Sequence, residues 1–269
     1  DGAQELCSGL RLVGAHTDSP NLSVKPNPVT GRDGCVQLGV DIYGGALLNP
    51  WFDRDLALAG RLTVLTAEGE LRSVLFDSVS PVAVVPSLAI HLDREANKQR
   101  SINPQKDVVP LVMLGDAKGF DFKSWLAEKL AEQDKTCVGA RVMDYELSLY
   151  DTQPPALVGI DRSFVTSARL DNLLSCYAGL RAIIDEQEAE WSMLVATDHE
   201  EVGSASTIGA QGPMLMDALT ALVPDPLLNQ QLRNESWMLS VDNAHAVHPN
   251  YADKHCLLYT SPSPRDNTT

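Results

Sequence analysis

The fold of this chain is decided by an apolar run that ends in acidic residues, WSMLVATDHEEVGS at residues 191–204. The apolar part predicts a buried strand, and the glycine and serine after it turn the chain towards a helix. Successive side chains of a strand point to opposite sides, so Glu200 and Glu201 can have different roles at the strand end. Two adjacent like charges repel, and a divalent cation is the simplest compensation. This stretch therefore predicts a core strand that ends at a metal site.

Segments on either side repeat the alternation of strand and helix. Strands are predicted at 10–15, 193–197 and 237–241, and helices at about 170–184 and 206–219. Alternating units of this kind imply an α/β fold with a mixed, largely parallel sheet that is flanked by helices on both faces. Such sheets collect functional residues at the carboxyl ends of their strands.

The middle of the chain has a different pattern, because it is rich in short β signals separated by turn residues. Residues 61–66 and 71–76 flank a Glu-Gly-Glu turn and predict a hairpin. Apolar residues at helical spacing predict one helix over 121–133. This region is therefore expected to be a β-rich insertion.

The predicted organisation is one domain interrupted by that insertion. Residues 1–20 and 161–256 would form the interrupted domain, and residues 21–160 the insertion. Residues 257–269 resemble a translated adapter or vector sequence, and we exclude them from the fold as an expected artefact. A natural disordered Ser/Pro tail is the alternative. We also expect the chain to be truncated at both ends.

Composition narrows the function classes. The 269 residues are 44% hydrophobic and 21% charged, which is typical of a globular protein, and the formal net charge is −15. Nucleic-acid binding needs a basic surface, and a membrane span needs about 20 apolar residues in a row, so neither partner is expected. The scattered cysteines indicate reduced thiols in a cytoplasmic protein and no thiolate zinc site. They are Cys7, Cys35, Cys137, Cys176 and Cys256.

His16 ends the first predicted strand and precedes Asp18 by two residues. In H-x-D the acidic residue can hydrogen-bond the ring nitrogen that faces away from a metal, which fixes the metal-binding tautomer. A buried histidine bonded to a nearby acid, without any metal, explains the same pattern equally well. We keep His16 as a candidate ligand and Asp18 as the residue that orients it.

Two further candidate ligands lie at the start of a helix and at the end of a strand. Asp171 begins the apolar helix, where capping shared with Asn172 is the alternative role. Asp242 follows the third strand, and His245 and His248 come soon after it. A solvated loop with two chance histidines is the alternative there.

Carboxylates with one imidazole per metal suit a pair of divalent ions, with zinc first and cobalt or manganese as replacements. Two bridged ions are a common hydrolytic arrangement. A general base needs a carboxylate that is not fully committed as a ligand, which one of the two glutamates can supply. His199 is expected to pack or hydrogen-bond rather than to ligate. Together these pieces predict a metal hydrolase.

Five longer blocks carry a family resemblance. They are HTDSP at 16–20, WFDRDL at 51–56, RLDN at 169–172, DHEEVGS at 198–204 and DNAHAVHPNYADKH at 242–255. In this order they resemble the aspartyl aminopeptidase family, the M18 metallopeptidases, over nearly the whole chain. The resemblance implies a sheet of the zinc-exopeptidase type and a dimerisation role for the β-rich insertion.

The resemblance also implies a role for each matched residue. His16, Asp171, Glu201 and Asp242 resemble the family's metal ligands, with Asp171 bridging two ions. Glu200 resembles the general base.

Other matched residues resemble groups that contact the substrate. His245 resembles a substrate-contacting histidine, and His91 one that reaches into a neighbouring subunit's site. Members of the family assemble as large homo-oligomers, often tetrahedral dodecamers. The family's last histidine ligand and the groups that read an acidic side chain would lie beyond Cys256, so this chain is expected to lack them.

The expected function is therefore removal of the N-terminal residue, preferentially Asp or Glu, from peptides by a di-metal aminopeptidase. A related di-zinc amidohydrolase acting on N-acyl amino acids would keep the same site with another substrate. A non-catalytic assembly subunit is the third reading, although the matched site residues are chemically intact.

Overall fold

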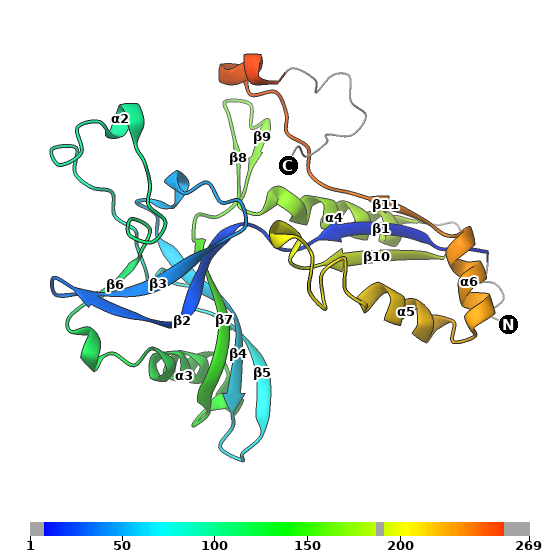
Figure 1. Cartoon of the computed structure of the whole chain (residues 1–269), viewed down its shortest axis with the longest axis horizontal. Coiled ribbons are helices and arrows are strands. Elements are labelled where there is room, and N and C mark those ends of the chain that lie inside the picture. The colour runs from blue at the N-terminus through cyan, green and yellow to red at the C-terminus, as the bar shows by residue number, and fades with distance from the viewer. Residues whose placement is uncertain (1–7, 187–190, 256–269) are drawn as a thin grey trace. The chain divides into compact units, whose positions relative to one another are not determined.

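The computed structural model describes residues 8–186 and 191–255 (Figure 1). They fall into two compact units: unit 1 lies within the segments Asp1–Ser19 and Arg169–Thr269, and unit 2 is Pro20–Ala168. No helix of the described ranges is long and apolar enough to span a membrane. The segment 257–269, predicted to be an artefact, lies outside the described residues.

A parallel three-stranded sheet forms the centre of unit 1. Strand β1 (Arg11–His16) lies between β10 (Ser192–Thr197) and β11 (Trp237–Ser240), and both neighbours run parallel to it. The three predicted strands are confirmed. Because all three are parallel, their carboxyl ends meet at one edge of the sheet.

Helices cover both faces of this sheet. Helix α4 (Leu170–Asp185) lies against one face through small residues, and a Cβ added at Gly179 would come within 3.0 Å of the Val13 and Leu194 side chains. On the other face α5 (Met214–Leu222) and α6 (Pro226–Glu235) share an apolar cluster with β1 and β10. Its buried members are Leu10, Leu12, Val195, Leu219, Val223 and Leu232.

The helix predicted over 206–219 was wrong at its start. It begins at Met214, after Pro213, because the preceding residues form tight turns. The Ser206 hydroxyl accepts the backbone N–H of Gly209 at 2.9 Å, and a Cβ at Gly209 would lie 2.2 Å from the Ser204 carbonyl oxygen. Helix α6, which Asp225 caps, was not predicted.

Unit 2 is an antiparallel six-stranded sheet in the order β5-β4-β7-β2-β3-β6. The strands are β2 (Asn21–Arg32), β3 (Cys35–Tyr43), β4 (Leu56–Leu65), β5 (Leu71–Asp77), β6 (Leu111–Leu114) and β7 (Arg141–Asp151). The predicted hairpin is confirmed as β4–β5, and the predicted helix as α3 (Phe122–Gln133). Buried leucines and valines of the sheet pack against Phe122, Leu126 and Leu130 of α3.

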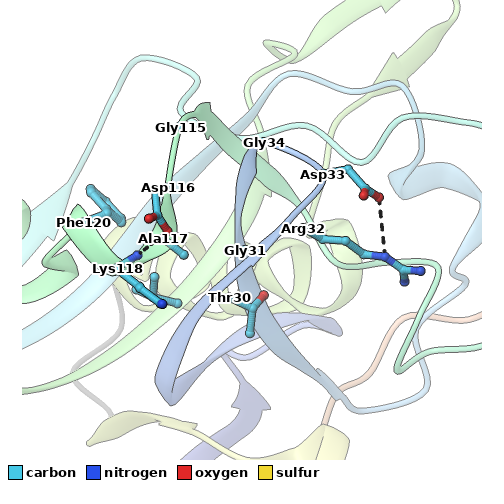
Figure 2. Close-up of a pocket in the computed structure, with 11 residues that line it drawn as sticks. Thr30, Gly31, Arg32, Asp33, Gly34, Gly115, Asp116, Ala117, Lys118 and Phe120 are labelled. Atoms are coloured by element: carbon cyan, nitrogen blue, oxygen red, sulfur yellow. Dashed lines mark hydrogen bonds and ion pairs between the residues drawn. The ribbon is translucent and has the colours of Figure 1, made fainter.

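Short elements complete the described chain. They are α2 (Ala96–Gln99), the hairpin strands β8 (Ala156–Val158) and β9 (Phe164–Thr166), and the 3-10 turns η1 (Asn49–Trp51), η2 (Ala117–Gly119), η3 (Lys135–Cys137), η4 (Glu200–Val202) and η5 (Pro249–Lys254). An open hollow of about 730 Å³ lies in unit 2 beside the β2–β3 turn (Figure 2). The Arg32 and Asp33 side chains at this turn pair with each other at 3.6 Å, and both are largely exposed.

Candidate metal centre

Three parallel strands deliver the predicted site residues to one edge of the unit 1 sheet. His16 is the last residue of β1, Glu200 and Glu201 lie in η4 after β10, and Asp242 follows β11. Asp171 joins them from the start of α4, where its backbone is not helical. The carboxyl-edge location predicted from the alternating pattern is thus where these side chains lie.

His16 is the buried centre of this cluster, with 4% of its surface exposed. Its Nδ1 lies 3.1 Å from the Asp18 carbonyl oxygen, which can only accept, so Nδ1 carries a hydrogen and, in the neutral ring, Nε2 holds the lone pair. Nε2 faces the Asp242 carboxylate at 3.4 Å, Asp171 at 3.5 Å and Glu200 at 3.8 Å. This is the tautomer that binds a metal through Nε2.

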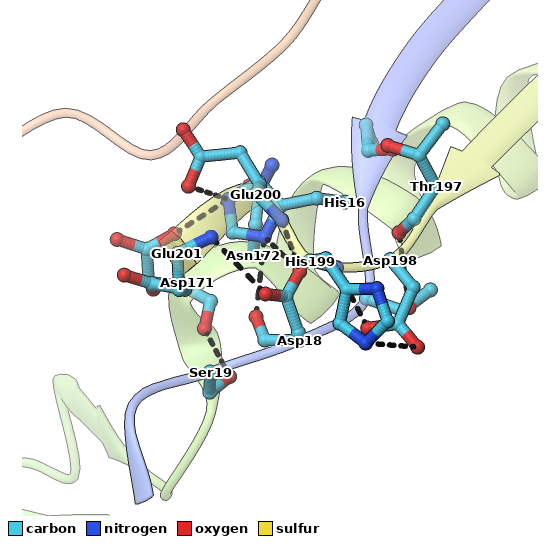
Figure 3. A network of polar contacts seen from close by, with 12 residues as sticks. His16, Asp18, Ser19, Asp171, Asn172, Thr197, Asp198, His199, Glu200 and Glu201 are labelled. Carbon is cyan, nitrogen blue, oxygen red and sulfur yellow. Dashed lines mark hydrogen bonds and ion pairs between the residues drawn. The ribbon is translucent and has the colours of Figure 1, made fainter. Parts of the chain in front are cut away.

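Asp18 connects the histidine to the two glutamates (Figure 3). Its carboxylate is nearly buried and accepts the backbone N–H groups of Glu200 and Glu201, each at 3.1 Å. The sequence suggested that the carboxylate would orient the histidine ring, and one of its oxygens does lie 3.4 Å from Nδ1. The ring Nδ1–H donates its hydrogen bond to the Asp18 backbone carbonyl, whereas the Asp18 side chain accepts from the turn that carries both glutamates.

The cluster contains more negative charge than it can balance. Burial, followed by the charges of Asp171 and Glu200, raises the pKa of Glu201 to about 7. Burial and the neighbouring carboxylate of Asp242 also raise the pKa of Asp171. Burial raises the pKa of Glu200 against the opposing effect of His16. A bound dication would stabilise the charged forms of these groups.

The same carboxylates also shift the pKa of His16. Burial lowers the pKa of His16, but the surrounding carboxylates of Glu200, Asp242 and Asp18 outweigh burial, and the net shift is upward. A cation at this position therefore meets a strongly favourable potential.

Two overlapping sets of side chains can hold a cation. One set is His16, Asp171 and Asp242, and the other is His16, Glu200 and Glu201. In each set the candidate ligand atoms lie within 4.8 Å of one another. Imidazole and carboxylate donors at this density fit a zinc-type site.

The other histidines named from the sequence have different surroundings. The His199 ring bonds the Ser206 hydroxyl at 2.8 Å, which confirms that it hydrogen-bonds. His245 is exposed, and it is the smallest of the contributions that oppose the upward shift in the pKa of Asp171. His248 accepts the Asn250 backbone N–H within η5. His91 lies on an exposed turn of unit 2 and is not part of the described cluster.

Sequence reasoning missed the residues that join two of the carboxylate-bearing segments. The Asn172 amide donates to the Val241 carbonyl at 2.9 Å, and the Asn243 amide donates to the Leu170 carbonyl. These reciprocal bonds connect the segment of Asp171 to that of Asp242. A detectable signal was present, because an asparagine directly follows the candidate ligand in both motifs.

A cavity of about 210 Å³ adjoins this cluster. His16, Glu200 and Asp242 lie on its wall, and the rest is mostly small or apolar, including Met214 and Met238. None of the described residues that line it is a lysine or an arginine. The cavity can therefore take a small or apolar group next to the carboxylates.

Comparison with known families shows which proteins this chain is similar to. Residues 1–261 match the family described as "Aminopeptidase I zinc metalloprotease (M18)". The chain belongs to the M18 family. It is 55% identical over 248 residues to "Probable M18 family aminopeptidase 2" of Ectopseudomonas mendocina (strain ymp). That match covers 92% of this chain and 57% of the relative, so the chain spans little more than half the relative's length.

Solved M18-like structures share the fold. The chain in the cryo-EM structure of the Ape4 and Nbr1 complex has a TM-score of 0.83 and 33% identity, covering 91% of this chain and 51% of that one. The mApe1 dodecamer of S. cerevisiae has a TM-score of 0.75 and 27% identity, covering 92% and 57%. The zinc metalloprotease description of the family supports a divalent metal at the cluster.

Proposed function

We propose that this chain carries part of the catalytic site of a di-metal aminopeptidase that removes N-terminal residues from peptides. The observation that carries the proposal is the convergence of three carboxylates on Nε2 of His16, at 3.4–3.8 Å, in a member of the M18 family. His16, Asp171 and Asp242 would hold one ion. Asp171 would bridge to a second ion held by Glu201.

When bound, the ions would polarise the scissile carbonyl and acidify a water molecule. Glu200 would accept the proton of the attacking water and pass it to the leaving amine. Its raised pKa brings it closer to the range in which a carboxylate can both take and return a proton. Asp18 keeps Glu200 in place through the backbone, and His245 would contact the substrate.

Zinc is the proposed metal, with cobalt or manganese as replacements, and two ions the proposed number. The preference for N-terminal Asp or Glu is proposed from the family resemblance. The described cavity has no lysine or arginine on its wall, so groups outside that wall would bind the acidic side chain of the substrate.

The domain roles are part of the proposal. Unit 1 would be the catalytic domain of the zinc-exopeptidase type, and the β-rich insertion the dimerisation domain. Assembly as a homo-oligomer is supported by the dodecamer among the similar structures. His91 of the insertion would then contact a neighbouring subunit's substrate.

Paired substitutions at the two glutamates test this assignment. Glu200→Gln should keep zinc and lower turnover of aspartyl and glutamyl anilides by about 10²–10⁴-fold, since only the base is lost. Glu201→Gln should lose the second of the two zinc ions and keep the ion held by His16, Asp171 and Asp242, as measured by titration calorimetry and metal analysis. The proposal fails if Glu200→Gln retains full turnover, or if both variants bind zinc as tightly as the unaltered chain.

A further inference from the structure

A long loop of unit 2 runs outside the six-stranded sheet and carries α2 (Figure 1). Its two ends are rooted in the apolar core through the buried Val85 and Val108. Between these ends the apolar side chains of Leu88, Ile90 and Leu92 are 48–75% exposed. Packing against the core therefore does not hold this part of the loop, and polar contacts must do so.

Asp53 anchors the first end of the loop. Its carboxylate accepts the backbone N–H of Ser87 at 2.8 Å, and its own N–H donates to the Val85 carbonyl at 2.9 Å. Hydrogen bonds from the hydroxyl and the N–H of Ser87, with a smaller contribution from the charge of Arg100, lower the pKa of Asp53. The carboxylate is thus charged at neutral pH, and a charged acceptor makes the stronger kind of hydrogen bond.

Arg100 anchors the second end on the same turn. Its guanidinium carbon lies 3.9 Å from the centre of the Phe52 ring, and the group donates to the Asn49 side-chain oxygen at 3.3 Å. A planar guanidinium stacks on an aromatic face in a way that an ammonium group cannot reproduce. Because Phe52 is buried, Arg100 rests on a fixed surface. The short segment 49–53 therefore holds both ends of the loop segment 88–99.

We propose that Asp53 and Arg100 position His91 by closing residues 88–99 into a loop of defined conformation. His91 lies on an exposed turn within this segment. A loop with both ends fixed has fewer conformations to lose, which lowers the entropic cost of a contact. This inference rests on the proposed function, in which His91 contacts a substrate bound by a neighbouring subunit. Asp53 and Arg100 act through His91 and do not touch the substrate.

Hydrogen exchange tests the closure without any turnover. Asp53 has a φ of 59°, so Asp53→Gly keeps this backbone conformation and removes only the acceptor. It should speed exchange about tenfold at Leu92, Ala96 and Gln99, whose N–H groups donate to carbonyls within the loop. Asp33→Gly is the matched control, because Asp33 also has a positive φ, of 51°, and should leave these amides unchanged. Asp53→Asn retains an acceptor oxygen and should restore slow exchange.

Arg100→Lys separates stacking from charge at the second end. It keeps the positive charge but loses the planar contact with Phe52, so exchange at Gln99 should again speed up. Circular dichroism checks that every variant folds. Loop amides that exchange at the unaltered rate in both Asp53→Gly and Arg100→Lys would overturn the closure, whatever the chain does to a peptide.

Kinetics then test whether the closed loop acts through His91. In the assembled protein, Asp53→Gly and His91→Ala should each raise KM for aspartyl anilides about 3–10-fold and leave kcat nearly unchanged, since binding alone is weakened. The double variant should be no worse than His91→Ala, because nothing remains to be positioned.

Two kinetic results overturn the positioning role. One is a double variant whose KM shows the product of the two single effects, which would mean that Asp53 acts independently of His91. The other is a KM that His91→Ala leaves unaltered, which would remove the contact to be positioned. Turnover of Glu200→Gln distinguishes either result from failure of the proposed reaction itself.

Discussion

The two units of this chain bury different kinds of side chain. Unit 2 closes a continuous apolar core between its sheet and α3, with Leu22, Leu58, Leu62, Leu126 and Leu147 almost fully buried. Unit 1 has a much smaller apolar cluster. Its buried side chains include polar ones that connect strand ends and helices: His16, Asn172, Ser175 and Asn229.

This difference indicates that the two units are stabilised in different ways. Apolar burial is non-directional and needs no ligand, so unit 2 can hold its fold through packing. Unit 1 gathers carboxylates whose pKa values are raised by burial and by one another, which opposes folding when they are charged. We therefore expect unit 1 to depend on a bound cation and unit 2 to be indifferent to it.

The largest effect should come from the core of unit 2. Leu58 on β4 is fully buried, and Leu58→Ala should lower the free energy of unfolding of unit 2 by about 2–5 kcal/mol through lost burial and a cavity. Leu75→Ala on β5 is the control, because Leu75 is 84% exposed and should change stability by less than about 0.5 kcal/mol. Urea unfolding monitored by hydrogen exchange measures the stability of each unit separately. A comparable loss of protection in unit 1 would contradict the independence of the two units.

Zinc binding should stabilise unit 1 and leave the stability of unit 2 unchanged. Zinc at a hundredfold excess over its dissociation constant should stabilise unit 1 by about 2.7 kcal/mol, because only the folded cluster binds it. Asp171→Asn should remove most of this gain, whereas Asp144→Asn on β7 should keep it. Thermal unfolding with and without zinc measures both effects. Equal stabilisation of unit 2 would show that the cluster is not the binding site.

The sequence predicted elements well where a pattern is local. The apolar runs of β1, β10 and β11 and the spacing of α3 depend on nearby residues alone, and all four were confirmed. The start of α5 could not be found in this way. Ser206 and Gly209 form turns through contacts with His199 and Ser204, and such contacts exist only after the chain has folded back.

The candidate site shows the same limit. Parallel strand ends place His16, Glu200 and Asp242 together, so their proximity follows from topology. The hydrogen bonds of Asp18 to the η4 backbone and of Asn172 to the β11 end join residues far apart in sequence. No pattern within a window of residues specifies which backbone group such a side chain meets.

Two aspartates with the same kind of bond allow a matched test of the units. Asp18 accepts two backbone N–H groups in unit 1, and Asp121 accepts those of Lys123 and Ser124 at the start of α3 in unit 2. Asp18→Ala should destabilise unit 1 by about 1–3 kcal/mol, because it leaves the backbone N–H groups of Glu200 and Glu201 without their acceptor. Asp121→Ala should cost about 1 kcal/mol in unit 2 as a lost helix cap.

Metal affinity separates the two aspartates further. Asp18→Ala should weaken zinc binding about 10–100-fold, as expected for a group that supports the ligands, and Asp121→Ala should leave it unchanged. Calorimetric titration of both variants with zinc measures this. An unchanged affinity in Asp18→Ala would remove Asp18 from the metal centre and reduce it to a structural residue.

The smallest expected effect is a difference in pH dependence between the units without metal. In unit 1 the folded-state pKa of Glu201, about 7, exceeds its ordinary value of 4.5, so the folded unit binds a proton more tightly than the unfolded chain. Its stability should fall as pH rises from about 5 to 7, by less than about 1.4 kcal/mol per pH unit because the group is partly exposed to screening water. The raised pKa of His16 acts in the same direction.

Unit 2 should respond in the opposite sense and at lower pH. Hydrogen bonds from Ser87 and Ser124 lower the pKa values of Asp53 and Asp121, so the stability they contribute is present above about pH 4 and lost only in stronger acid. Between pH 5 and 7, in the presence of a chelator, the stability of unit 2 should stay constant while that of unit 1 falls. Glu201→Gln should flatten the slope of unit 1, because the titrating carboxylate is gone. Zinc should reverse the slope, since protons compete with the metal for the same ligands. A metal-free unit 1 that gains stability towards pH 7 would mean that its carboxylates are compensated by groups other than a cation.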